Sequence, residues 1–160
     1  MSSPYSNVDS QAQSLGSMQM DDNYRLIRFV EAQASVYEHV CSELRRGHKT
    51  SHWMWFIFPQ IKGLGHSAVA KEFAISSRKE AEAYLQHPLL GPRLHECTRL
   101  VNALEGRSIS QIFGYPDDLK FLSCMTLFVH ATTDNQDFAT AIQKYFAGHE
   151  DPLTIERLEG

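Results

Sequence analysis

The chain has 160 residues, of which 42% are hydrophobic, and its formal net charge at pH 7 is −4. This length and composition fit one globular domain with one hydrophobic core. The negative charge argues against a protein that binds nucleic acid through a broad basic surface, so no nucleic-acid partner is expected. No run approaches the roughly 18 consecutive apolar residues that indicate a membrane-spanning helix, so no membrane association is expected.

The three cysteines, Cys41, Cys97 and Cys124, show no CxxC spacing. An odd number of unclustered cysteines favours free thiols in a reducing compartment over a disulfide framework or a zinc knuckle. The first residues lack the basic region and apolar core of a secretory signal peptide. We therefore expect a cytoplasmic protein.

Residues 1–21 are rich in Ser, Gln, Asn and Met and contain almost no aliphatic bulk. Such a segment buries too little apolar surface to offset the entropy cost of ordering it, which predicts a disordered tail. A single helical domain is expected over residues 22–160.

Helix signals follow one another closely from residue 22 onward. Asp22 is a candidate cap for a first helix that Gly47 ends, because apolar residues recur at three- and four-residue steps between them. Ser77 and Glu80 form a predicted capping box before KEAEAYLQH. A further helix with one apolar face is expected to end at Gly106.

The next signals surround the most apolar part of the chain. Ser108 and Gln111 form a second predicted capping box, for a short helical turn that ends at Gly114. Pro116 stands where a first helical residue is expected. The segment that follows, LKFLSCMTLFVHA, is apolar nearly all round, which is typical of a buried central helix.

Two more helices are expected after residue 133. Asp134 precedes an amphipathic segment that Gly148 closes, and Asp151-Pro152 begins a short final helix. We find neither an alternating strand pattern of useful length nor an internal repeat. The sequence therefore predicts an all-α fold, a single-domain multihelical bundle of six or seven helices around a central apolar helix.

The stretch HWMWFIFPQ, residues 52–60, contains both tryptophans of the chain. In a helix or a strand, Trp53 and Trp55 cannot both face the same side of the segment as Met54 and Phe56. We expect at least one tryptophan in the core, and the other could border a pocket that holds a flat ligand. His52 and Gln60 lie at the polar edges of the stretch, and His52 is either a structural hydrogen-bonding residue or a general base.

The central helix carries a polar stripe. Asp117, Lys120, Ser123, Thr126 and His130 recur at three- and four-residue steps, which places them along one face. Burial of a lysine or an aspartate costs several kcal/mol unless it is paired. The stripe is therefore either the solvent-facing edge of a mostly buried helix, with Asp117 and Lys120 as a local ion pair, or the lining of a pocket.

The sequence KGLGHS, residues 62–67, follows the aromatic stretch. Gly63 and Gly65 lie before Ser67, a candidate cap for a helix through residues 68–73. This loop is either a flexible turn between helices or a group of backbone N–H donors for an anion. The chain has no HExxH motif, no cysteine-histidine set, no Walker loop and no GxGxxG motif between a strand and a helix, so neither a metal ion nor a cofactor is expected.

Three blocks of the sequence resemble one known family. RFVEAQASVYEHVCSELRRGHKTSHWMWFIFPQIKGLGHS, EAEAYLQHPLLGPRLHECTRLVNALEGRS and IFGYPDDLKFLSCMTLF together resemble the bacterial family called domain of unknown function eighteen-ten, from about Arg28 to His149. The resemblance implies a mainly helical fold and no established activity. The calpastatin label sometimes given to this family does not suit the sequence, because calpastatins are disordered inhibitors.

We expect a small, flat, anionic, nucleotide-like ligand to bind in a pocket between the HWMWF segment and the helix that begins at PDDLK. Lys120 would hold the anionic group, the tryptophans would hold the ring, and whether a reaction follows is left open. The expected site residues are His52 and Asp118 for proton transfer and Trp53, Trp55, Gln60, Lys120, Ser123 and Thr126 for ligand binding. The alternative is a non-enzymatic helical module that binds another protein. The oligomeric state is left open.

Overall fold

The computed structural model describes residues 22–160, and the predicted disordered tail lies outside them. Those residues contain ten helices and no strand, which confirms the all-α fold. The helices are α2 (Ile27–Gln33), α3 (Tyr37–Arg46), α4 (Met54–Ile57), α5 (Ala68–Glu72), α6 (Arg78–Gln86), α7 (Leu90–Asn102), α8 (Ile109–Phe113), α9 (Asp117–Val129), α10 (Gln136–Phe146) and α11 (Pro152–Glu159).

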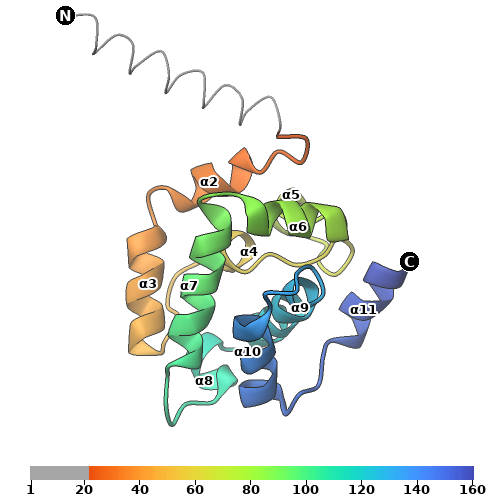
Figure 1. Ribbon diagram of the computed structural model, residues 1–160. Coiled ribbons are helices and arrows are strands. Elements are labelled where there is room, and N and C mark those ends of the chain that lie inside the picture. Colours follow the sequence, from red (N-terminus) through yellow and green to blue (C-terminus); the bar gives the residue numbers. More distant parts are fainter. Residues whose placement is uncertain (1–21) are drawn as a thin grey trace, which may run out of the picture.

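Helix α9 is the centre of the bundle, as the sequence predicts. It contacts α6, α8, α10 and α11, and a second group of contacts joins α7 to α3, α6 and α10 (Figure 1). Phe121, Cys124, Met125, Leu127 and Phe128 of α9 are all fully buried. Because these side chains point in several directions from the helix axis, α9 can be buried only if other helices surround it.

The first predicted helix is divided into α2 and α3, which is one reason why the helix count exceeds six or seven. Asp22 caps the start as expected, since its carboxylate accepts from the N–H groups of Leu26 and Ile27. Between the two helices the Val36 N–H donates to the Gln33 carbonyl, a three-residue hydrogen bond that interrupts the α-helical pattern. The break lets α2 pack on α4 while α3 packs on α7.

Several local capping signals predict helix ends correctly, but α7 ends at Asn102 rather than at the predicted Gly106, and Pro116 precedes the first residue of α9 rather than being that residue. Gly47 ends α3 in the left-handed conformation at φ 73°, which glycine adopts without a steric penalty. Ser108 and Gln111 form both halves of the predicted capping box. Ser67 accepts from the Ala70 N–H at the start of α5.

The other predicted capping box forms only in part. The Ser77 hydroxyl accepts from the Glu80 N–H, as the box requires. The Glu80 carboxylate does not return to Ser77, but accepts from the backbone and hydroxyl of Ser76 and from Arg28. The Glu80 carboxylate therefore pairs with Arg28, which is distant in the sequence, instead of completing the capping box with Ser77.

The aromatic stretch inserts into the core as a single short helix, α4. Trp53, Met54, Ile57 and Phe58 are buried, and the Phe58 ring centroid lies 5.0 Å from that of Phe121 on α9. The chain then leaves the core as a loop whose two ends are joined. The Lys62 N–H donates to the Ile75 carbonyl at 2.8 Å, and the Ile75 N–H donates to the Gln60 carbonyl at 2.8 Å. This closure holds residues 62–74, including α5, against the body of the bundle.

The structure also describes the surroundings of the cysteines and the apolar character of the helices. Cys41, Cys97 and Cys124 are free and buried, as expected for thiols that behave as small apolar side chains. Among residues 22–160, no helix has the length and apolar character needed to cross a membrane.

Candidate functional site

Two cavities lie on opposite sides of the loop formed by residues 62–67. One, which we call the tryptophan cavity, has a volume of about 500 Å³ and is bordered by the end of the aromatic stretch, the loop, α9 and the start of α11. The other, the arginine cleft, has a volume of about 530 Å³ and lies between the start of α2, the loop, α5 and the start of α6. Both volumes fall within the range of small-molecule sites.

The tryptophan cavity contains four of the eight predicted site residues. Trp55 and Gln60 reach it from the aromatic stretch, and Lys120 and Ser123 reach it from α9. The Lys120 ammonium lies 5.0 Å from the centroid of the Trp55 ring, which is cation–π distance. An aromatic face and a cation therefore border the same cavity, although their residues are far apart in the sequence.

The charge on Lys120 is only partly neutralised. Its ammonium lies 3.4 Å from an oxygen of Asp117, but the other oxygen of Asp117 lies 2.7 Å from the ammonium of Lys49. The Lys49 side chain is 8% exposed, so this closer ion pair is shielded from water. Two lysines share one carboxylate, which leaves one positive charge in this cluster, while Asp151 contributes a negative charge to the same cavity.

Ser123 and Thr126 attach α11 to α9. The Ser123 and Thr154 hydroxyls both donate to Oδ2 of Asp151, at 2.8 and 2.6 Å. The Thr126 hydroxyl accepts from the Asp151 N–H at 3.0 Å. Oδ1 of Asp151 receives no hydrogen bond from the described residues, and Asp151 lines the cavity. The polar stripe thus has a third role beyond the two anticipated ones, because it anchors another helix as well as lining a cavity.

Trp53 belongs to the core. It is 2% exposed, and its indole N–H donates at 3.0 Å to Glu43, a carboxylate that is itself fully buried. Glu43 also accepts from the backbone of Thr50 and from the backbone and hydroxyl of Ser51. Burial alone raises the pKa of Glu43, but these donors outweigh it and hold the pKa at about 2. Glu43 therefore fixes the segment that leads into α4.

This shifted pKa predicts an acid-dependent loss of stability. The pKa of Glu43 is lower in the folded protein than its ordinary value of 4.5, so its contribution is complete above about pH 4.5 and declines as the pH falls toward 2. The loss should total about 3 kcal/mol over that interval. Urea unfolding at a series of pH values measures it, with Glu43→Gln as the control that lacks this part of the slope. An identical slope in the variant would contradict the assignment.

The other predicted site residues lie away from the tryptophan cavity. His52 is exposed, Asp118 is half-buried, and neither lines the cavity. An oxygen of Asp118 accepts from the N–H of the next residue, Leu119. Thr126 is fully buried and reaches the site only through Asp151.

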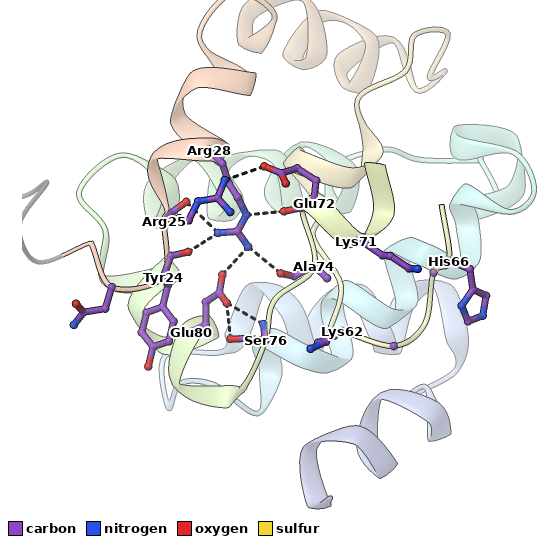
Figure 2. Close-up of a pocket in the computed structure, with 13 residues that line it drawn as sticks. Tyr24, Arg25, Arg28, Lys62, His66, Lys71, Glu72, Ala74, Ser76 and Glu80 are labelled. Carbon is purple, nitrogen blue, oxygen red and sulfur yellow. Dashed lines mark hydrogen bonds and ion pairs between the residues drawn. The ribbon is translucent and has the colours of Figure 1, made fainter. Parts of the chain in front are cut away.

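The arginine cleft is organised by a buried ion pair (Figure 2). The side chains of Arg28 and Glu80 are 10% and 3% exposed, and their charged groups are 2.9 Å apart. The Arg28 guanidinium also donates to the backbone carbonyls of Tyr24, Arg25, Glu72 and Ala74. Figure 2 shows Lys62, Lys71 and His66 to one side of this pair, around the loop.

Sequence reasoning missed several residues that organise the core and the two cavities. Glu43 could have been noticed as a charge among the buried positions of α3. Asp151 was expected only as the beginning of a helix. For Lys49 and Arg28, whose partners are Asp117 and Glu80, the sequence contains no local signal.

Among residues 22–160, no group of three or more histidine, cysteine, aspartate or glutamate side chains has an arrangement that could hold a metal ion. The tryptophan cavity offers an aromatic ring, a lysine, a hydroxyl group and the carboxylate of Asp151, and the arginine cleft offers cations together with the carboxylates of Glu72 and Glu80.

Comparisons with known proteins agree with this fold. A family model described as "Protein of unknown function (DUF1810)" matches residues 23–158. The crystal structure of the conserved hypothetical protein Rv1873 from Mycobacterium tuberculosis is similar to this chain, with 59% sequence identity and a TM-score of 0.86, and the match covers 87% of this chain and 99% of that one. A search of curated proteins found no match. The family model spans nearly all of the described residues, and the chain belongs to the DUF1810 family.

Proposed function

We propose that the tryptophan cavity binds a small, flat, anionic ligand of the nucleotide class. The observation that carries this proposal is the position of the Lys120 ammonium, 5.0 Å from the Trp55 ring centroid, at a cavity of about 500 Å³. A base stacked on the half-buried Trp55 would lie next to a cation for its phosphate.

Two further polar groups that line the cavity suit the edge of a base. Gln60 offers an amide donor and an amide acceptor, and Asp151 offers a carboxylate oxygen that is free of other hydrogen bonds from the described residues. The proposal concerns binding and names no reaction, since neither His52 nor Asp118 lines the cavity.

A thermal-shift titration with AMP, GMP, CMP and UMP tests the proposal. At a hundredfold excess over Kd, a ligand stabilises the folded state by about 2.7 kcal/mol, which is a shift in Tm of about 5–10 °C for a domain of this size. Trp55→Leu and Lys120→Met should each abolish the shift, because they remove the stacking face and the cation.

Lys79→Met is the matched control. Lys79 is an exposed lysine on α6 that lines neither cavity, so this variant should keep the full shift. A shift that survives in both Trp55→Leu and Lys120→Met would contradict the proposed site, and the absence of a shift with all four nucleotides would contradict the ligand class.

A protein-interaction surface is the second candidate, and one observation favours it. Tyr115, Leu119 and Leu153 are large apolar side chains that remain exposed, and the two leucines line the tryptophan cavity. A partner protein could cover this apolar rim. In that case nucleotides would leave Tm unchanged, and Leu119→Ser with Leu153→Ser would weaken an association detected by sedimentation velocity.

A further inference from the structure

The tryptophan cavity and the arginine cleft adjoin each other at the loop. Gly65 and His66 line both of them. A small depression between them is lined by Trp55 and Gln60 from one cavity and Ala74 from the other, together with Gly65. A ligand that crosses the loop would therefore remain in contact with the protein from one cavity to the other.

The arginine cleft carries an excess of positive charge. Arg25 is paired with Glu72 and Arg28 with Glu80. The ammonium groups of Lys62 and Lys71 form no ion pair or hydrogen bond with the described residues, which leaves two uncompensated positive charges on a chain whose net charge is −4. Lys120 adds a third cation on the opposite side of the loop.

The backbone N–H groups of residues 63–66, in the loop between these cations, are free of hydrogen bonds within the described residues. Gly63 has a positive φ of 101°, a conformation that favours glycine, and its carbonyl accepts from Arg157 of α11. Successive free N–H groups with lysines on both sides suit an extended phosphate chain more than a single carboxylate.

We propose that the two cavities form one groove for a nucleoside diphosphate conjugate. The diphosphate lies across residues 62–67, between Lys120 on one side and Lys62 and Lys71 on the other. The base stacks on Trp55, and the hydroxyl groups of the second part of the ligand meet Ser76 and the carboxylate of Glu72 in the arginine cleft. This inference rests on the proposed function for the position of the base, and it adds the length and charge of the ligand.

Isothermal titration calorimetry with matched pairs of probes tests the groove. The pairs are AMP with ADP-ribose and UMP with UDP-glucose, so that each long ligand contains its short one. For the pair that binds, we expect the conjugate to bind at least tenfold more tightly than the mononucleotide. The double variant Lys62→Met/Lys71→Met should remove this gain and leave mononucleotide affinity within about twofold of wild type. Lys120→Met should weaken both ligands.

The double variant Arg46→Met/Lys79→Met controls for net charge, because it removes two exposed cations that line neither cavity. It should bind both ligands as the wild type does. If mononucleotides bind through Trp55 and Lys120 while the conjugates bind no more tightly, or if Lys62→Met/Lys71→Met has no effect, the groove is overturned and the proposed function stands. If neither length binds, both are overturned.

Discussion

Replacement of Arg28 by methionine should lower the free energy of unfolding by about 4 kcal/mol, the largest effect that we expect from a single substitution. The change removes five hydrogen bonds and leaves the carboxylate of Glu80 buried without its cation. It also separates the segment before α2 from the turn between α5 and α6, since Arg28 joins the two. Chemical denaturation of the purified variant measures the loss.

Two further variants distinguish the contribution of the Arg28–Glu80 ion pair to the free energy of unfolding from the effect of removing any arginine. Arg25→Met removes a neighbouring arginine whose side chain is 69% exposed, and it should cost less than about 1 kcal/mol. Glu80→Gln combined with Arg28→Met should recover part of the stability, because the buried charge is then absent. A double variant that is as unstable as the sum of the two single variants would show that the pair itself contributes little.

Replacement of Glu43 by glutamine should cost about 3 kcal/mol. An amide oxygen replaces one carboxylate oxygen, and an amide N–H₂ group replaces the other, so the donors of Ser51 and Trp53 cannot all keep an acceptor. Urea unfolding at neutral pH measures the change. A Trp55→Phe background leaves Trp53 as the only tryptophan, so its fluorescence reports whether the indole remains in its buried environment.

Glu38→Gln is the control for this substitution, since Glu38 lies on the same helix but is exposed. It should change stability by no more than about 0.5 kcal/mol. Equal effects of the two substitutions would mean that the cluster of donors around Glu43 contributes no more than an ordinary surface carboxylate.

The sequence predicts those helix ends whose capping groups are local. Gly47 and the Ser108–Gln111 box act within a few residues of the helix that they bound, and their chemistry is visible in any short window. The break between α2 and α3 was missed because apolar spacing continues across it. It arises from tertiary packing, in which the two helices contact different partners.

The candidate site was predictable to the extent that it depends on residue type. Tryptophans in a stretch with polar borders and a lysine on an apolar helix are unusual enough to be selected from the sequence, and Trp55 and Lys120 do border one cavity. Trp53 has the same residue type but lies in the core, where its ring packs against Phe58 and Phe113 and its indole N–H donates to Glu43. Whether these residues bind a nucleotide stays a prediction.

Docking of α11 has a consequence for how the proposed site would behave in solution. This helix and its N-cap supply Leu153 and Asp151 to the tryptophan cavity, and Arg157 of the helix contacts the loop at Gly63, 94 residues earlier in the chain. If α11 leaves the bundle, the cavity loses the wall that this helix forms. Ligand binding in the cavity and docking of α11 are therefore linked equilibria. A ligand that occupies the cavity should slow amide hydrogen exchange throughout α11, including residues that it never touches.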